Sequence, residues 1–380
     1  MPATRNASVP ARQPFLTGIT DENGSRLGIY KYDANGKVIS SGWNGNNYLF
    51  TYPSSNQVTV TDPLGKATTM NYSLVRLSKH MVSQSQPAGS GSAAVTRTLT
   101  YDVNGNPKTS LDWAGISTSY TYDLTRNLEI SRTEAVGTAD ARTTSTQWHA
   151  TMALPVVIAS PKLIATFAYD AAGNLLSKTE QATTDANGVQ GLAATKIGPV
   201  RQWTNTYNTF GQIVTTKGPR TDVDDTTTYA YDVAGNLATV TNGAAHVTLF
   251  ADYDAHGRPR RITAPNKVVT EIDYFARGWV RSRKVSSQGV TQTTDYEYDG
   301  VGQLARIYMP DGSYIAYTYD NAHQLTDIAD GLGNSIHYTL DAMGNRLTEE
   351  VKDTSGKLWR QTTREFDVLS RLKKQTGAAQ

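Results

Sequence analysis

The stretch Tyr231-Asp232-Val233-Ala234-Gly235-Asn236 decides the fold, because the same pattern returns along the whole chain. Complete copies of Tyr-Asp-x-x-Gly-Asn comprise Tyr101, Asp102, Gly105 and Asn106; Tyr169, Asp170, Gly173 and Asn174; and Tyr231, Asp232, Gly235 and Asn236. Weaker copies begin at or beside Tyr32, Tyr253, Tyr298, Tyr319, Asp341 and Phe366, at a step of about 21 to 24 residues. Self-similarity at a fixed period indicates a repeat architecture, so the repeat is the unit to explain.

One repeat can be read from its turn chemistry between Tyr298 and Asp320. Pro310-Asp311-Gly312 lies between two strand-like runs, 303–309 and 313–319. Proline presets φ at the first corner of a turn, and glycine accepts a positive φ later in it. The repeat is therefore predicted to be a β-hairpin of about 21 residues that a second tight turn joins to the next hairpin.

Two turns in every repeat predict two strands in every repeat. Further half-repeat turns are Asp62-Pro63-Leu64-Gly65, Asp112-Trp113-Ala114-Gly115 and Asp330-Gly331-Leu332-Gly333. Weaker units anchored at Tyr52, Tyr72, Tyr122, Trp148, Tyr207, Tyr274 and Leu340 bring the total to about 15 units and about 30 strands. The fold class is therefore all-β: one long antiparallel meander of short strands. At about 4.8 Å per strand it would run about 140 Å, so it must curl into a spiral or open shell.

The tyrosines suggest how the strands are held together. Returning strands carry tyrosines at i and i+2, as at Tyr229 and Tyr231, and such pairs share one face of a strand. We expect one face of the sheet to carry an aromatic ladder, in which each cross-strand contact contributes about 0.2 to 1 kcal/mol.

The repeats divide the chain into two parts. Residues 1–15 form a polar N-terminal segment, and residues 16–380 form the repeat array. The phase is broken near 78–97 and 181–201, where polar, glycine-rich sequence predicts loop insertions that project from the sheet.

Composition excludes several classes of function. The 36 basic and 34 acidic residues leave a net charge of +2 with no block of one sign, which argues against a nucleic-acid partner. The absence of cysteine excludes disulfides and thiolate chemistry. No apolar run is long enough to span a membrane, and the polar start of the chain does not have the apolar core of a signal peptide.

No residue pattern predicts catalysis or a cofactor. The chain has no nucleophile elbow, phosphate-binding loop or dinucleotide fingerprint, so it is not expected to be an enzyme. Asp33 with Asn35, and Asp222 with Asp224 and Asp225, place oxygens close together, but neither completes a calcium loop, and turn capping explains them. Exposed tryptophans on a flat sheet can stack on sugar rings, and the candidates for such glycan contacts are Trp43, Trp203, Trp279 and Trp359.

These repeats resemble the Rhs, or YD-repeat, family of bacterial proteins and, more distantly, the teneurins. The resemblance covers about Leu16 to Leu372. Besides the Tyr-Asp copies, it rests on Asp112-Trp113-Ala114-Gly115 leading to Tyr120-Thr121-Tyr122-Asp123, on Gln147-Trp148-His149-Ala150-Thr151, and on Leu340-Asp341-Ala342-Met343-Gly344-Asn345-Arg346.

The resemblance implies a β-sheet ribbon wound into a hollow shell that encapsulates a C-terminal toxin. Such proteins act against other cells, through a contractile secretion apparatus or within toxin complexes. They are bacterial, and are cytoplasmic before export or secreted through a specialised apparatus. The expected partners are a toxin cargo or flanking shell segments, and another copy through open sheet edges. The self-cleaving core and toxin domain of complete members have no match in this sequence. The alternative function is a binding module for carbohydrate or a cell surface that uses exposed aromatic side chains.

Overall fold

The computed structural model describes residues 15–26, 28–43 and 46–379, and side chains at 43, 378 and 379 fall outside the description. The predicted polar segment 1–15 therefore lies outside it, except for Phe15. Over the described residues, 31 strands form one sheet. Each strand pairs antiparallel with the next along the chain, as β17 does with β18 and β18 with β19. The predicted all-β meander of about 30 strands is confirmed.

The first half of the chain forms β1 (Gly18–Ile19), β2 (Gly28–Tyr32), β3 (Val38–Trp43), β4 (Asn46–Ser54), β5 (Gln57–Thr61), β6 (Ala67–Val75), β7 (Ser78–Gln86), β8 (Val95–Tyr101), β9 (Pro107–Leu111), β10 (Ser117–Asp123), β11 (Leu128–Glu134), β12 (Arg142–Trp148), β13 (Pro155–Ser160), β14 (Leu163–Tyr169) and β15 (Leu175–Thr183). The second half forms a 3-10 turn η1 (Gly191–Ala193), then β16 (Lys196–Tyr207), β17 (Ile213–Lys217), β18 (Thr226–Tyr231), β19 (Leu237–Thr241), β20 (Val247–Tyr253), β21 (Pro259–Thr263), β22 (Val269–Tyr274), β23 (Val280–Ser287), β24 (Val290–Tyr298), β25 (Leu304–Tyr308), β26 (Tyr314–Tyr319), β27 (Leu325–Asp330), β28 (Ser335–Leu340), β29 (Arg346–Lys352), β30 (Leu358–Phe366) and β31 (Leu372–Ala379).

Successive turns alternate between the two long edges of this ribbon. We call the edge formed by the turns after the tyrosine anchors, such as 102–105, 232–235 and 299–302, the anchor edge. The opposite edge, formed by turns such as 62–65, 112–115 and 330–333, is the half-repeat edge.

β-bulges are concentrated at the anchor edge. In β18, Ala230 pairs with Thr239, but Tyr231 pairs with Leu237, so the ladder shifts by one residue at the anchor. The same shift directly precedes Tyr32, Tyr72, Tyr101, Tyr122, Trp148, Tyr169, Tyr207, Tyr274, Tyr298, Tyr319, Leu340 and Phe366. Because each bulge bends and twists its strand, a bulge repeated at one edge curls the whole ribbon.

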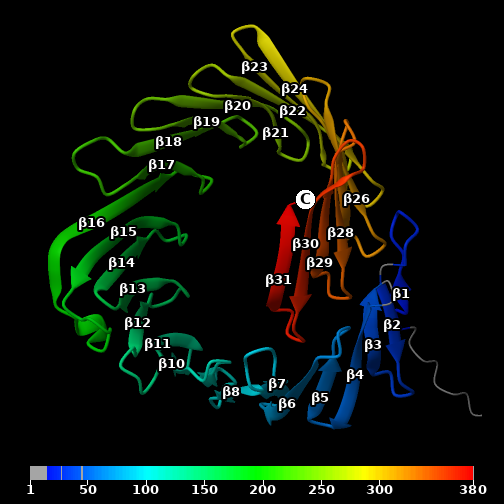
Figure 1. Ribbon diagram of the computed structural model, residues 1–380. Coiled ribbons are helices and arrows are strands. Elements are labelled where there is room, and N and C mark those ends of the chain that lie inside the picture. The colour runs from blue at the N-terminus through cyan, green and yellow to red at the C-terminus, as the bar shows by residue number, and fades with distance from the viewer. Residues whose placement is uncertain (1–14, 27, 44–45, 380) are drawn as a thin grey trace, which may run out of the picture.

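The ribbon curls through a full coil. Figure 1 shows the strands arranged around an open centre, with β1–β3 at one end of the chain beside β26–β30 near the other. Hydrogen bonds join residues 276 to 302 positions apart across this overlap. The expected spiral or open shell is therefore observed.

The two breaks in the repeat phase are shorter than predicted. Strand β7 occupies the first nine residues of the expected insertion 78–97, where its backbone pairs with β6 and β8, and β8 begins at Val95, so only 87–94 form a loop. Within 181–201, residues 184–195 form the loop, which lies against β12 and β13 rather than projecting. Asp185 is 3% exposed and accepts the backbone N–H groups of Gln190 and Gly191 at 2.8 and 3.2 Å, which holds the loop down.

The single-layered sheet leaves almost no core. The buried apolar cluster consists of Ala159, Ile164 and Ala194, where the loop 184–195 covers the sheet. Among the described residues, no large side chain is less than 2% exposed. Stability must therefore come from the hydrogen-bond ladder and the turns rather than from a packed interior. None of the described segments is a helix of the length and apolarity needed to cross a membrane.

Candidate functional site

Each Tyr-Asp-x-x-Gly-Asn segment forms a turn that its own side chains close. The Oδ1 atom of Asp232 accepts the backbone N–H groups of Ala234 and Asn236 at 2.9 and 2.8 Å. The Asn236 side chain donates to the Oδ2 atom of Asp232 at 3.1 Å. Gly235 has φ of +84°, in the left-handed region that glycine adopts without a steric penalty. The structure places Asp102, Gly105 and Asn106, and likewise Asp170, Gly173 and Asn174, in the same arrangement.

This arrangement stabilises the ionised form of the aspartate. The hydrogen bond from the Asn174 side chain is the main cause that lowers the pKa of Asp170, and Asn236 has the same effect on the pKa of Asp232. At Asp254, where Arg258 replaces the asparagine, the hydrogen bond from the guanidinium is the main cause that lowers the pKa to about 2. Half-repeat turns use the same chemistry, with Asn334 donating to Asp330 at 2.7 Å. The acidic turns are thus capped by their own residues.

In many of these turns the tyrosine caps the hydrogen-bond ladder of the preceding strand. The pairing between β17 and β18 begins only at Thr215, so the carbonyl of Ile213 lies beyond the ladder. The hydroxyl of Tyr231 donates to that carbonyl at 2.8 Å. Tyr169 does the same for Pro155 at 2.9 Å, beyond the first rung between β13 and β14.

We call this hydrogen bond, from an anchor side chain to a backbone carbonyl in the preceding part of the ribbon, the tyrosine clamp. It recurs around the coil. Nine described anchors donate to a backbone carbonyl in the preceding strand or, for Tyr32, just before it, namely Tyr32 to Leu16, Tyr52 to Val38, Tyr101 to Met81, Trp148 to Glu129, Tyr169 to Pro155, Tyr207 to Leu175, Tyr231 to Ile213, Tyr253 to Leu237, and Tyr319 to Leu304. At Trp148 the indole N–H takes the place of the tyrosine hydroxyl and donates to the Glu129 carbonyl at 2.8 Å. The anchors therefore act through their polar ends, where we had expected a ladder of stacked rings. Direct ring contacts involving an anchor occur at a few places, such as Phe15 with Tyr32.

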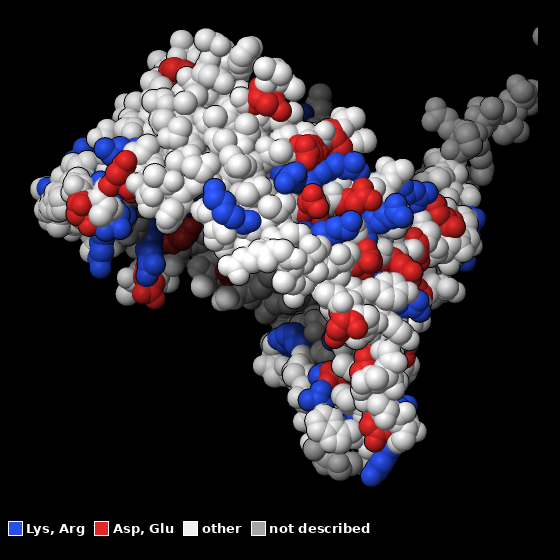
Figure 2. Space-filling view, turned by 90° about the horizontal axis from the view of Figure 1, so that it is seen from above, with Lys and Arg blue, Asp and Glu red and all other residues white. Residues whose placement is uncertain are grey.

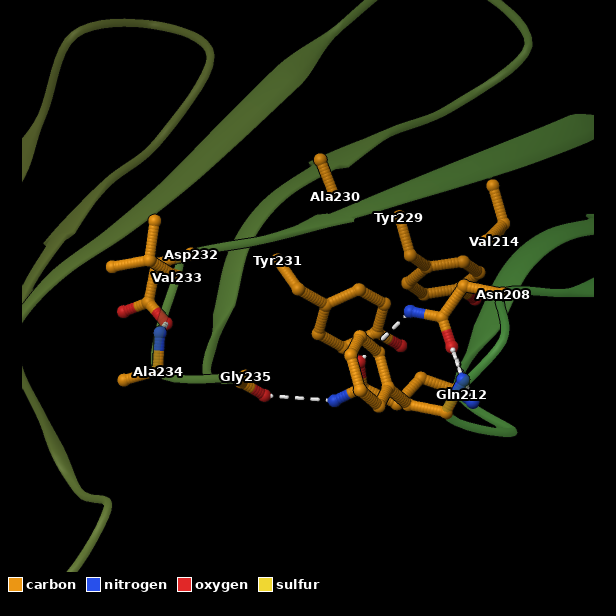
Figure 3. A pocket seen from close by; sticks show the side chains of 11 residues that line it. Asn208, Gln212, Val214, Tyr229, Ala230, Tyr231, Asp232, Val233, Ala234 and Gly235 are labelled. Atoms are coloured by element: carbon orange, nitrogen blue, oxygen red, sulfur yellow. Dashed lines mark hydrogen bonds between the residues drawn. The ribbon is translucent and has the colours of Figure 1, made fainter.

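Neighbouring anchor turns are also tied sideways. The residue after the turn glycine reaches the next turn, as Gln212 does when its amide donates to the carbonyl of Gly235 at 2.8 Å. Figure 3 shows this bond at the rim of a shallow pocket on the anchor edge, with Tyr229 and Tyr231 on its wall. Gln303 makes the equivalent bond to the carbonyl of His323 at 2.9 Å.

A seam joins the two ends of the coil where they overlap. Half-repeat turn 21–25 meets the anchor turns after β22, β24 and β26. The Asn23 side chain donates to the Oδ2 atom of Asp299 at 3.0 Å and accepts the backbone N–H of Gly300 at 3.1 Å. The His323 Nε2 atom lies 2.7 Å from the Oδ2 atom of Asp21, whose side chain is only 4% exposed.

A second contact extends the seam along the coil. The guanidinium of Arg371, in the anchor turn after β30, donates to the Ser90 carbonyl at 3.0 Å and to the Ser92 hydroxyl at 2.8 Å. Ser90 in turn donates its backbone N–H to Asp367 at 2.9 Å. The seam therefore always brings an anchor edge against a half-repeat edge.

Sequence reasoning missed the seam, although one residue signals it. His323 occupies the place of the turn glycine with φ of +63°, a left-handed conformation that is costly for a side chain and usually reflects a constraint from elsewhere. At this position its ring reaches Asp21 of the neighbouring coil. The sequence shows a histidine where most other anchor turns have glycine. It does not show that the partner of this histidine is Asp21.

Three of the tryptophans proposed as glycan contacts, Trp203, Trp279 and Trp359, have described side chains and lie on different parts of the ribbon. Trp203 has Lys178 and Arg201 over its ring at 5.1 and 5.0 Å, and Trp279 packs against Tyr298 with centroids 5.4 Å apart. Trp359 on β30 is 59% exposed. The side chain of Trp43 lies outside the described residues.

Charges on the sheet are paired and mixed in sign. Figure 2 shows basic and acidic side chains interspersed over one face rather than collected by sign. Some pairs join neighbouring strands, as Arg260 does with Asp273 at 2.9 Å and Arg360 with Glu349 at 2.6 Å. No three histidines or carboxylates within the described segments come together as metal ligands. Asp33 caps its own turn, and Asp222 pairs with Arg220 at 2.6 Å.

Residues 193–360 match the family model described as teneurin YD-shell. No curated protein matches the chain in sequence. The match begins at η1 and ends within β30, and the anchor turns outside it have the same hydrogen bonding as those inside it.

Solved structures of toxin complexes share the fold. The crystal structure of TcdB2-TccC3-Cdc42 is 14% identical with a TM-score of 0.60, covering 89% of this chain and 22% of that one. The Photorhabdus luminescens Tc holotoxin pore with the mutation TccC3-D651A is 15% identical, with the same score and coverage. TcdB2-TccC3 without its hypervariable C-terminal region is 14% identical with a TM-score of 0.59. The chain therefore spans about a fifth of the length of these relatives, 22% in each case.

Proposed function

We propose that this chain is a segment of an Rhs-type YD-repeat shell and that it forms part of the shell wall, enclosing a polypeptide cargo together with further shell coils. The observation that carries the proposal is the seam. A ribbon that meets itself edge to edge after one coil can build a continuous wall, whereas an open strip cannot. The contacts of Asp21 with His323 and of Arg371 with Ser90 make that closure specific.

The chemistry of the repeat supports a structural role rather than catalysis. The aspartates are held ionised by hydrogen bonds within their own turns, and the anchor hydroxyls are engaged by carbonyls. These groups maintain the curvature and the ladder of the ribbon. A toxin cargo, a bacterial source and export through a specialised apparatus are the finer parts of the proposal. They are supported by the likeness to Tc toxin structures.

A protease-protection experiment tests the wall. A flexible, protease-sensitive reporter is joined to the end of the chain, and its digestion is compared between the native sequence and the seam variant Asp21→Ala/Arg371→Ala. We expect the reporter to survive longer in the native chain. Melting curves of both proteins verify that the sheet is folded. Equal digestion rates in two folded proteins would refute enclosure.

A further inference from the structure

One contact of the seam is shielded from water. The side chain of Asp21 is 4% exposed, and its Oδ2 atom lies 2.7 Å from the Nε2 atom of His323, whose side chain is 25% exposed. The other carboxylate oxygen, Oδ1, accepts the backbone N–H of Ser25 within its own turn at 2.8 Å. Among the described residues, the imidazole is therefore the one hydrogen-bond partner that reaches this carboxylate from across the seam.

The backbone of His323 holds the imidazole in this place. Its N–H donates to the Asp320 carbonyl at 3.0 Å, and its carbonyl accepts the side-chain amide of Gln303 at 2.9 Å. Its φ of +63° is the conformation for which most other anchor turns use glycine, and a side chain there has a steric cost. The turn therefore aims a titratable ring at Asp21, and the contact breaks when the two turns separate.

The other charged groups of the facing turns keep their charge near neutral pH. On these turns or beside them they are Glu22, Arg26, Arg277, Asp299 and Asp320. Carboxylates and guanidinium groups do not change charge between about pH 5 and 8, whereas an imidazole ordinarily does so near about pH 6.5. Burial alone would raise the pKa of Asp21, but the hydrogen bonds from His323 and Ser25 hold it below the ordinary value of 3.8. Asp21 thus stays ionised while the imidazole opposite it gains or loses a proton.

We propose that Asp21 and His323 form a pH-sensitive latch, which holds the first turn of the ribbon against the seam more tightly in mild acid than above neutral pH. A protonated imidazole donates a charge-assisted hydrogen bond, which is about twice as strong as a neutral one. The contact favours the protonated ring, so its stabilisation is complete in mild acid and falls as the pH rises through neutrality. It is lost again at lower pH, where Asp21 itself becomes protonated. The inference rests on the seam of the proposed wall and adds regulation of that seam.

The second contact of the seam has no titratable group of this kind. There the guanidinium of Arg371 donates to Ser90 and Ser92, and Asp367 accepts the backbone N–H of Ser90. Neither charged side chain ordinarily titrates near neutrality. The loop 87–94 should therefore be equally protected across this pH range and serves as a reference within the same molecule.

Hydrogen exchange of the full chain at about pH 5.5 and about pH 8 tests the latch. Each rate is divided by the intrinsic rate of an unstructured peptide at the same pH, so the protection factor is free of the chemical effect of pH. We expect the protection factors of β1 and β2 to be higher at the lower pH by at least about threefold, because the charged hydrogen bond is the stronger one. Those of loop 87–94 should not change. Equal protection of β1 and β2 at the two pH values would overturn the proposal.

Variants of one residue identify the group that titrates. His323→Gln keeps an N–H donor without a titrating ring, and His323→Gly restores the residue of most anchor turns, so the turn is not strained. Protection of β1 and β2 should not depend on pH in either variant. His337→Gln is the matched control, because His337 pairs with Asp327 at 2.6 Å across β27 and β28 rather than across the seam, and it should keep the native pH dependence. A pH dependence that persists in both variants of His323 would refute the latch.

Failure of the latch is distinct from failure of the wall. If the wall encloses its cargo without a latch, the native chain protects the reporter better than Asp21→Ala/Arg371→Ala does, and the ratio of the two digestion rates is the same at both pH values. If the latch exists without enclosure, the protection factors of β1 and β2 change with pH while both proteins lose the reporter at the same rate.

Discussion

Removing one anchor hydroxyl tests how the ribbon is held together. Tyr231→Phe keeps the ring and removes the bond of 2.8 Å to the Ile213 carbonyl. That carbonyl lies beyond the first rung between β17 and β18, so the ladder cannot satisfy it instead. A hydrogen bond of this kind contributes about 0.5 to 1.5 kcal/mol net, and we expect the free energy of unfolding to fall by about 1 kcal/mol.

Tyr229→Phe is the matched control on the same strand. Among the described residues none is hydrogen-bonded to the Tyr229 hydroxyl, so its removal should change the free energy of unfolding by less than about 0.5 kcal/mol. Urea unfolding of the three proteins measures both effects, and an unchanged m-value would show that the denatured state is not altered.

The clamp also predicts where stability is lost. In a repeat array each unit is stabilised mainly by its nearest neighbours. In Tyr231→Phe, hydrogen exchange should therefore accelerate chiefly in β17 and β18. Adding Tyr319→Phe, which frees the Leu304 carbonyl at 3.0 Å, should remove about another 1 kcal/mol, because the two sites share no contact. Equal losses for Tyr229→Phe and Tyr231→Phe would refute the clamp and point to ring packing instead.

Three further predictions follow from the turns, the seam and the tryptophans. Asp254 has its pKa lowered from 3.8 to about 2, and the pKa values of Asp170 and Asp232 are also lowered, so these groups stabilise the fold above the unfolded-state pKa. Thermal melts should show this stability being lost as pH falls from about 4 towards 2, with a smaller loss in Asp254→Asn; a variant with the native pH profile would contradict the assignment. Asp21→Ala and His323→Gly should each speed hydrogen exchange in β1 and β2, whereas protection that is unchanged in both would mean that the seam carries no stability. On a glycan array we expect Trp359→Ala to match the native chain; a glycan bound by the native chain and lost in the variant would favour a carbohydrate-binding module.

The turns are the part of this fold that the sequence predicts best. Asp232, Gly235 and Asn236 complete their hydrogen bonds within six residues, so local chemistry settles the conformation wherever the pattern recurs. The strand number follows from counting turns. The insertion near 78–97 was overestimated because β7 has few apolar residues, and only pairing with β6 and β8 shows that it is a strand.

The clamp was partly within reach of the sequence. The spacing of tyrosines shows that they belong to one face, and the idea that they brace a neighbouring strand follows from it. The sequence does not show that the hydroxyl, rather than the ring, makes the contact. That depends on the pairing between β17 and β18, which begins only at Thr215 and leaves the Ile213 carbonyl for the phenol.

The sequence by itself determined the repeat, its two turns, the antiparallel order and the need to curl, because each follows from interactions among residues close together in the chain. Only the tertiary structure decided which turns meet. The curvature of the coil is the sum of many small bulges and twists, so the offset of 302 residues between Asp21 and His323 has no counterpart in any local pattern. For the same reason Asn23 reads as an ordinary turn residue in the sequence and becomes a contact residue only when its turn is placed against the turn that contains Asp299 and Gly300.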